Sequence, residues 1–174
     1  MSAAILLIDP KYPHNVGQSV RACAAYGIQD LYYTGDRMNA AMKELKRLPR
    51  EERMRGFRSV KLQHLERPFD YLPNLIPVAV EIRPNSEALP VFEHPENALY
   101  VFGPEDGSLG SGVLGQCHRF VAIPSAHCLN LSMAVGTVLY DRQAKLDPAR
   151  PLDTRAANAP GYFEVRDLLP RPRP

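Results

Sequence analysis

The 174-residue sequence has no long apolar run and few cysteines. No apolar stretch approaches the roughly 20 residues that a membrane-spanning helix needs. The first residues, MSAAILLID, have neither a basic leader nor a small-residue cleavage site, so we expect no signal peptide. Cys23, Cys117 and Cys128 have unrelated spacings and predict no disulfide framework. These absences favour a soluble cytoplasmic protein of one ordinary domain.

The chain also lacks a strong net charge, but its basic residues are unevenly placed. The formal net charge is +2, whereas residues 37–67 hold ten lysines and arginines against four acidic residues. Such a segment is typical of a surface that binds a polyanion, although a solvated helical face has the same composition. Five arginines are spaced to share one surface that could bind such a polyanion, namely Arg47, Arg50, Arg53, Arg55 and Arg58.

Short apolar runs alternate with helical segments along most of the chain. We expect strands at residues 3–8, 31–33, 60–62, 77–82, 99–102 and 120–123, and helices at 16–26, 38–48 and 131–144. Strands separated by helices predict an α/β fold with a mostly parallel sheet and helices on both faces. Asn15 stands where the first helix needs an N-cap, and Gly27 stands where it needs a stop.

The composition changes after Lys145. Six prolines fall within the last thirty residues, which end in LLPRPRP, and proline at this density breaks regular elements. We therefore divide the chain into a folded domain at residues 1–145 and a Pro/Arg-rich arm or tail at residues 146–174. Whether the arm docks on the domain, docks on a partner subunit or stays free is left open by the sequence.

Three loops that follow expected strands contain unusual residues, and ligands of open α/β sheets bind at such strand ends. In the first loop, DPKYPHNVGQSVR (residues 9–21), Arg21 interrupts an apolar helical turn and should need a partner. The second, FGPEDGSLGSGVL (residues 102–114), spreads four glycines over ten positions without the Gly-Lys-Ser/Thr ending of a phosphate loop. The third follows the strand at residues 120–123 and leads to a helix that Asn130 or Ser132 can cap.

Two Cys-His pairs contain residue types that zinc prefers as ligands. They are Cys117-His118 and His127-Cys128, and their spacing matches no common zinc pattern. We therefore expect no bound metal.

Taken together and in this order, the three loops resemble the signature motifs of the SpoU/TrmH-type RNA 2′-O-methyltransferases of the SPOUT superfamily. The matching residues are Asn15, Arg21 and Gly27, then Gly103-Pro104-Glu105, then Ile123-Pro124 and Leu129-Asn130-Leu131-Ser132. The short chain most resembles the minimal members, such as the tRNA wobble-position ribose methyltransferases. The resemblance implies a C-terminal trefoil knot, which is an exception among folds. It also implies S-adenosyl-L-methionine as methyl donor and a homodimer that acts on RNA, with tRNA favoured over ribosomal RNA.

The resemblance further implies roles for single residues. Arg21 would handle the ribose 2′-hydroxyl, and Asn15, Glu105 and Asn130 would order the site around it. A positioned arginine can stabilise a developing alkoxide or orient the neighbouring phosphate. The methyl donor would contact seven positions, namely Val80, Gly103, Glu105, Ile123, Cys128, Leu129 and Asn130. Cys128 and Ser108 depart from the family pattern of Ser and Gly, which affects the fine geometry of the methyl-donor pocket.

Two other functions stay open. An RNA-binding dimer of the same fold without methyl transfer would have no reason to keep the four site residues Asn15, Arg21, Glu105 and Asn130 together. A small-molecule nucleotide-binding enzyme would need a phosphate loop, which is absent, and would leave the basic segment unexplained.

Overall fold

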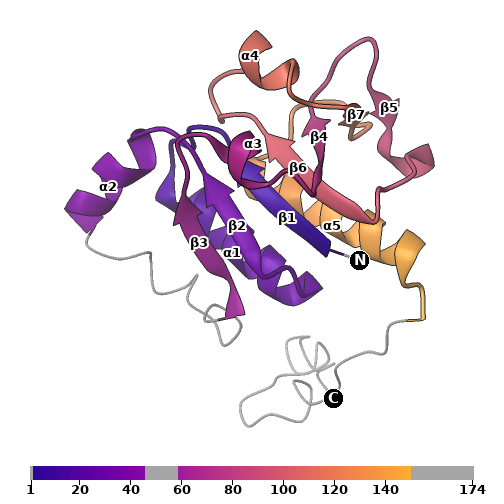
Figure 1. Cartoon of the computed structure of the whole chain (residues 1–174), viewed down its shortest axis with the longest axis horizontal. Coiled ribbons are helices and arrows are strands. Elements are labelled where there is room, and N and C mark those ends of the chain that lie inside the picture. The colour runs from indigo at the N-terminus through magenta and orange to yellow at the C-terminus, as the bar shows by residue number, and fades with distance from the viewer. Residues whose placement is uncertain (1, 46–58, 150–174) are drawn as a thin grey trace, which may run out of the picture.

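The structure is a computed structural model that describes residues 2–45 and 59–149, in which one parallel β-sheet lies between two layers of helices (Figure 1). The strands are β1 (Ser2–Leu7), β2 (Asp30–Tyr33), β3 (Lys61–His64), β4 (Ile76–Val80), β5 (Glu87–Ala88), β6 (Asn97–Phe102) and β7 (Arg119–Ala122). The helices are α1 (Pro13–Tyr26), α2 (Arg37–Leu45), α3 (Pro68–Tyr71), α4 (Ser111–Leu114) and α5 (Leu131–Leu146), with a 3-10 turn, η3, at Leu89–Val91.

The sheet has seven strands in the order β3-β2-β1-β6-β4-β7-β5, and every neighbouring pair is parallel. The chain builds one half outward from β1 to β3, then crosses to the other half, where β6 returns to pair with β1 along its whole length. Because all strands run the same way, their carboxyl ends share one edge. The loops that follow β1, β4, β6 and β7 therefore converge there, and the predicted α/β fold is confirmed.

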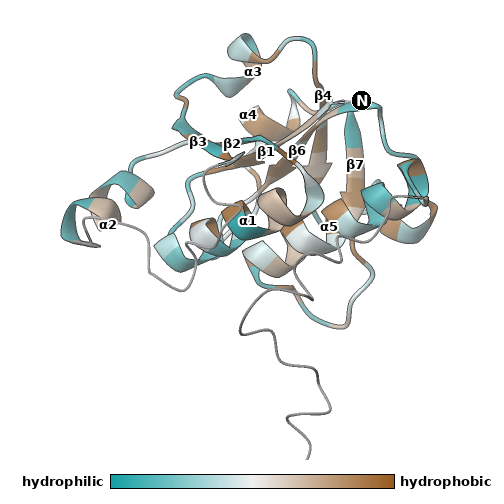
Figure 2. Cartoon of the chain, turned by 90° about the horizontal axis from the view of Figure 1, so that it is seen from below, coloured by the Kyte–Doolittle hydropathy of each residue, from teal (hydrophilic) through white to brown (hydrophobic). Residues whose placement is uncertain are grey.

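Apolar side chains cover both faces of the sheet. In β1, Ile5 and Leu7 point into the larger core, which α1 and α5 complete, and Ala4 and Leu6 point into the smaller core on the other face. Strands buried on both faces are continuous apolar runs, as β1 and β6 are in the sequence. Viewed at right angles to Figure 1, α1 and α5 lie on one side of the sheet and α3 and α4 on the other (Figure 2).

Helix α1 begins three residues earlier than we expected from the sequence. Pro13 occupies its first turn and Tyr12 is the N-cap residue. Proline suits this position because its fixed φ is already helical and it lacks the N–H that a first turn leaves unpaired. The prediction of Asn15 as N-cap is therefore wrong, and the Asn15 side chain is available for other contacts. Gly27 ends the helix with a left-handed φ of 72°, as predicted.

Four short elements have no counterpart among the predictions, namely α3, β5, η3 and α4. Each spans only two to four residues, too few for a periodic apolar pattern. The helix predicted at residues 38–48 is present as α2, whose described part ends at Leu45. The rest of the basic segment and residues 150–174 lie outside the described residues, so the division into a domain and an arm stays a prediction.

A buried polar network fixes the last turns of α5. The His94 ring bonds the Tyr100 hydroxyl through Nδ1 at 2.6 Å and the Asp141 carboxylate through Nε2 at 2.8 Å. Since a carboxylate only accepts, Nε2 carries the proton and Nδ1 accepts from Tyr100, so both ring nitrogens are satisfied in the neutral form. Burial lowers the pKa of His94 below its usual 6.5, although Asp141 acts in the opposite direction. The neutral histidine is therefore part of the core.

None of the helices in the described ranges is long and apolar enough to cross a membrane.

Candidate active site

An open pocket of about 180 Å³ lies at the carboxyl edge of the sheet. Its walls come from the ends of β4, β6 and β7 and from the first turn of α5 with the loop before it. The lining residues are Val80, Glu81, Ile82, Phe102, Gly103, Pro104, Glu105, Gly107, Ala122, Ile123, Ser125, Cys128, Leu129, Leu131 and Ala134. The second and third loops of the sequence pattern thus share one cavity, although more than twenty residues separate Gly103 from Cys128.

Six of the seven positions expected to contact the methyl donor line this pocket, namely Val80, Gly103, Glu105, Ile123, Cys128 and Leu129. The seventh, Asn130, is not part of the lining but follows Leu129 directly and caps α5. Gly103 permits close packing at the pocket wall, because a Cβ there would lie 3.3 Å from the backbone nitrogen of Leu109. That glycine lets the loop fold back onto the strand end.

The charge of the pocket lining has one sign. Glu81 and Glu105 contribute carboxylates, and no lysine, arginine or histidine is among the described residues that line the pocket. Acidic groups favour a ligand that carries positive charge and repel phosphate groups. The pocket therefore suits a cationic ligand and does not suit a phosphorylated nucleotide, which argues against the nucleotide-binding alternative.

Glu105 holds the first and second loops together. Its Oε2 accepts from the backbone nitrogen of Lys11 at 2.8 Å. Its Oε1 accepts from the backbone nitrogen of Tyr12 at 3.3 Å and from Asn15 Nδ2 at 2.8 Å. Hydrogen bonds to an ionised acceptor are stronger than bonds between neutral groups. The half-buried Glu105 carboxylate thus fixes the start of α1 against the loop after β6.

Asn15 and Asn130 extend this contact to the third loop. Asn130 Nδ2 donates to Asn15 Oδ1 at 2.9 Å. Asn130 Oδ1 accepts from the backbone nitrogen of Ser132 at 2.9 Å and from its hydroxyl at 2.7 Å, which confirms Asn130 as the cap of α5. A continuous series of side-chain bonds, from Glu105 through Asn15 to Asn130, therefore joins all three loops.

A second carboxylate, from the end of β4, also holds the loop after β6. Glu81 Oε2 accepts from the backbone nitrogen of Leu109 at 2.9 Å, and Leu109 is buried in the smaller core. The end of β4 is thereby tied to the loop after β6. We did not single out Glu81 from the sequence, although a charged residue directly after a buried strand was the signal that could have revealed it.

Arg21 lies apart from this arrangement. The buried face of α1 is formed by Val16, Val20 and Cys23, and the Arg21 side chain is exposed and is not part of the pocket lining. The expectation that Arg21 lies within an apolar environment and needs a partner there is therefore wrong for the single chain. Arg21 directly follows the buried Val20, and the helical rotation between consecutive residues places the Arg21 side chain on the outer face.

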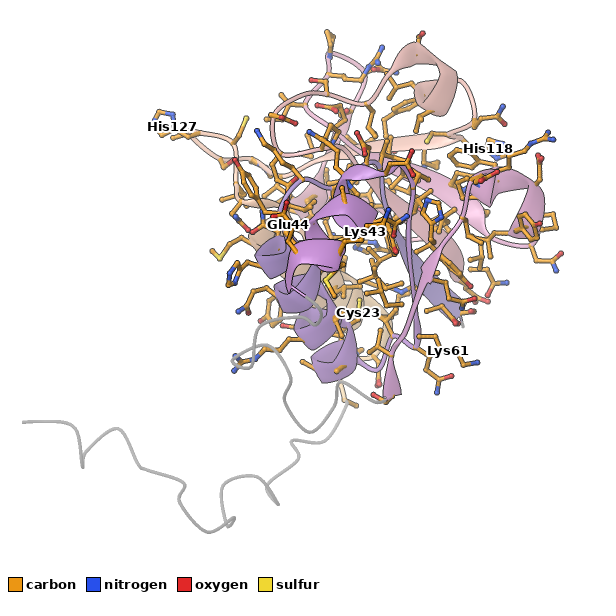
Figure 3. All side chains as sticks on the ribbon, turned by 90° about the vertical axis from the view of Figure 1, so that its left-hand side faces the viewer. Cys23, Lys43, Glu44, Lys61, His118 and His127 are labelled. Atoms are coloured by element: carbon orange, nitrogen blue, oxygen red, sulfur yellow. The ribbon has the colours of Figure 1, made fainter. Side chains whose placement is uncertain are left out.

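Other predicted residues are only partly placed. Arg47, Arg50, Arg53, Arg55 and Arg58 all lie outside the described residues. His118 and His127 lie on opposite sides of the molecule, so the two Cys-His pairs do not meet (Figure 3). Across residues 2–45 and 59–149 no three histidine, cysteine or acidic side chains are grouped to hold a metal ion.

Comparison with known families decides what kind of protein has this site. A model of the SpoU rRNA Methylase family matches residues 2–140, which is most of the chain. The chain belongs to this family.

Relatives of this SpoU methylase include enzymes of known substrate. The tRNA (cytidine-2′-O-)-methyltransferase TrmJ of Methanocaldococcus jannaschii is 26% identical over 182 residues, which cover 97% of this chain and 78% of that protein. A structure described as "Structural insights into the 2-OH methylation of C/U34 on tRNA" matches with a TM-score of 0.65 at 23% identity, covering 84% of this chain and 97% of the other. The SpoU methyltransferase AviRb of Streptomyces viridochromogenes, in complex with AdoMet, matches with a TM-score of 0.63 at 20% identity, covering 82% and 58%. At these identities the two structures show the fold.

Proposed function

We propose that this SpoU methylase transfers a methyl group from S-adenosyl-L-methionine to a ribose 2′-hydroxyl of RNA. The observation that carries the proposal is the series of bonds from Glu105 through Asn15 to Asn130, which joins three loops around a pocket with acidic lining. The family and its 2′-O-methylating relative support the same reaction. A dimer that binds RNA without transferring a methyl group is the alternative, and the labelling experiment below distinguishes the two.

The pocket residues fit the methyl donor in shape and charge. Branched apolar side chains of Val80, Ile123 and Leu129 offer an apolar surface for an adenine ring. The carboxylates of Glu81 and Glu105 favour a cation, and the donor has a positively charged sulfonium that supplies an activated methyl group. Cys128 lines the same pocket, so its weakly polar thiol would stand in for the serine hydroxyl of many relatives.

Arg21 is proposed to act in a site that two chains complete. It is exposed and is not among the residues that line its own pocket, so in this proposal a second chain brings it to the methyl donor. Helix α5 exposes 61% of Met133 and 63% of Tyr140, which lie two turns apart on one face. Exposed apolar residues on one helix face are typical of a protein interface. A homodimer that covers this face would explain both observations.

In such a site Arg21 would stabilise negative charge that develops on the 2′-oxygen, or bind the adjacent phosphate. Methyl transfer to a hydroxyl requires in-line approach of the oxygen to the methyl group. Holding both reactants in this geometry accounts for much of the rate enhancement. The bonds among Glu105, Asn15 and Asn130 would provide that fixed frame.

We favour tRNA as the substrate. TrmJ, whose match covers nearly the whole of this chain, acts on tRNA. The match to the structure concerned with C/U34 methylation on tRNA covers nearly the whole of that other chain. Ribosomal RNA is the alternative, since the family is described by that substrate. The basic segment with Arg47, Arg50, Arg53, Arg55 and Arg58 would dock the RNA through its phosphates. We keep the cytoplasm, where tRNA is abundant, as the expected location.

We also propose that the end of the domain is threaded into a trefoil knot. Residues 89–96 are hydrogen-bonded to the end of α5. Arg142 donates to the Pro95 and Glu96 carbonyls, both at 2.6 Å, and Lys145 donates to the Leu89 carbonyl at 2.6 Å. The last helix of the described residues is thus held against an earlier loop, which is compatible with the knotted family fold. An experimental structure whose chain straightens without a knot when its ends are pulled would contradict this proposal.

Two measurements test the function. Calorimetry with S-adenosylhomocysteine in excess chelator should show one site per chain, and absence of binding would overturn the methyltransferase proposal. Labelled methyl donor is then incubated with total RNA from cells that lack the protein, and the labelled nucleotide is mapped. Label in tRNA supports the favoured substrate, label in ribosomal RNA supports the alternative, and methyl-donor binding without label leaves a binding dimer.

A further inference from the structure

The start of α2 carries an arginine that connects two loops of the candidate active site. Arg37 Nε lies 2.9 Å from Asp9 Oδ2, and the same guanidinium donates to the Asp9 carbonyl. Arg37 Nη1 donates to both carboxylate oxygens of Asp106, at 2.9 and 3.0 Å. Asp9 follows β1 and Asp106 follows Glu105 directly in the chain. One side chain therefore spans the loop after β1 and the loop after β6.

The backbone around Asp9 is shaped for this contact. Asp9 is the one non-glycine residue in the described ranges with a positive φ, at 44°, and its nitrogen donates to Thr34 Oγ1 at 3.1 Å. Gly35 also has a positive φ, and a Cβ on it would lie 2.1 Å from Asp9 Oδ1. An uncommon conformation persists only where its surroundings enforce it, and such positions concentrate at functional sites. The turn before α2 thus leaves room for the Asp9 carboxylate, which Arg37 at the start of α2 contacts.

Asp106 has a second cation beside it. Lys11 Nζ lies 3.2 Å from Asp106 Oδ2, and the backbone nitrogen of Lys11 is one of the three groups that donate to Glu105. The hydrogen bond from Arg37 and, to a smaller extent, that from Lys11 hold the pKa of Asp106 below its usual range. Asp106 is therefore ionised at neutral pH, and Arg37 and Lys11 both hold the turn that carries Glu105.

We propose that Arg37 is a positioning residue for methyl-donor binding, acting through Asp106 on the Glu105 turn. Arg37 itself does not line the pocket, whereas Pro104, Glu105 and Gly107 on that turn all do. Loss of Arg37 removes the bidentate bond that fixes the turn and leaves the pocket lining chemically unchanged. The proposal rests on the proposed methyltransferase function and adds to it a residue outside the three sequence motifs.

The test compares Arg37→Gln with wild type. Glutamine keeps much of the length and polarity but cannot bridge two carboxylates. A charge-assisted bond at a partly exposed site predicts about tenfold weaker binding of S-adenosylhomocysteine. The KM for the methyl donor should rise by a similar factor, while kcat at saturating methyl donor stays near the wild-type value. Arg37→Lys should restore part of the affinity, since one ammonium reaches one carboxylate. A purely structural role would lower the melting temperature and kcat together.

The matched control is Arg67→Gln, which removes an exposed arginine from its 2.6 Å pair with Asp70, away from the pocket. It should leave methyl-donor affinity unchanged.

A double-mutant cycle locates the effect. Asp106→Asn removes the same ion pair from the other side, so it tests the proposal even if Arg37→Gln folds poorly. The double variant should bind S-adenosylhomocysteine no more weakly than Asp106→Asn alone, because the effects of substitutions within one network do not add. Normal affinity of both single variants, or additive losses in the double variant, would overturn the role of Arg37 while leaving the function intact. Failure of the wild type to bind S-adenosylhomocysteine would instead overturn the proposed function, and this inference with it.

Discussion

Replacing Glu105 by glutamine is the sharpest test of how the site is held together. The carboxylate accepts three hydrogen bonds, from Lys11, Tyr12 and Asn15. A glutamine amide has one oxygen and one NH₂ group, so at least one of the three N–H donors would face another donor. The bonds that remain would also change from charge-assisted to neutral.

The expected magnitude follows from that count. A hydrogen bond to a charged group contributes about 1.5–3 kcal/mol, and a neutral bond about 0.5–1.5 kcal/mol. Because Glu105 is only half-buried, we take the lower end and expect the substitution to cost about 2 kcal/mol. If the whole loss falls on the methyl-donor pocket, the affinity for S-adenosylhomocysteine drops about 30-fold.

The assay is calorimetry with S-adenosylhomocysteine, accompanied by thermal unfolding. For a domain of this size, 2 kcal/mol lowers the melting temperature by roughly 4–8 °C. Glu66→Gln is the matched control, because Glu66 is an exposed glutamate away from the pocket. Wild-type affinity and an unchanged melting temperature for Glu105→Gln would refute the argument that these three bonds order the pocket.

Three further predictions concern Arg21, His94 and the basic segment. Arg21→Ala should stay folded and bind the methyl donor normally but lose about 100- to 1,000-fold in single-turnover methylation, and Arg21→Lys should recover little. The pKa of folded His94 lies below its usual 6.5, so its contribution to stability is complete above pH 6.5 and is lost as pH falls through 6.5 towards the folded value. His94→Gln should flatten that dependence of the unfolding free energy. Reversing the charge of Arg50 and Arg53 should weaken RNA binding and reduce its salt dependence without changing methyl-donor affinity.

Each of these predictions has a control and a contrary outcome. Near-wild-type turnover of Arg21→Ala would show that the reacting hydroxyl is handled by another residue. His118→Gln, at an exposed position, should leave the pH dependence of stability unchanged, and an equal effect of both histidine variants would remove His94 as its source. Unchanged RNA affinity after reversal of Arg50 and Arg53 would mean that the basic segment is a solvated face.

The sequence alone determined the alternation of strands and helices. Continuous apolar runs such as β1, a helix that stops at Gly27 and a helix capped by Asn130 are each specified by residues adjacent in the chain. Local stereochemistry is enough for these features, because an apolar strand, a left-handed glycine or an N-cap depends on only a few neighbouring residues. The motifs that carried the family resemblance are likewise made of residues close together in the chain.

The tertiary structure decided which contacts the motif residues make. Glu105 and Asn15 are 90 positions apart and Asn130 is 115 positions from Asn15, so no local pattern specifies their contacts. The same holds for Arg37, whose partners lie 28 and 69 positions away, and for Arg21, whose exposure depends on which face of α1 packs against the sheet. Strand order fixes these distances in space: it brings the ends of β1, β4, β6 and β7 to one edge. A pocket is made of such long-range contacts, and therefore it exists only once the sheet has formed.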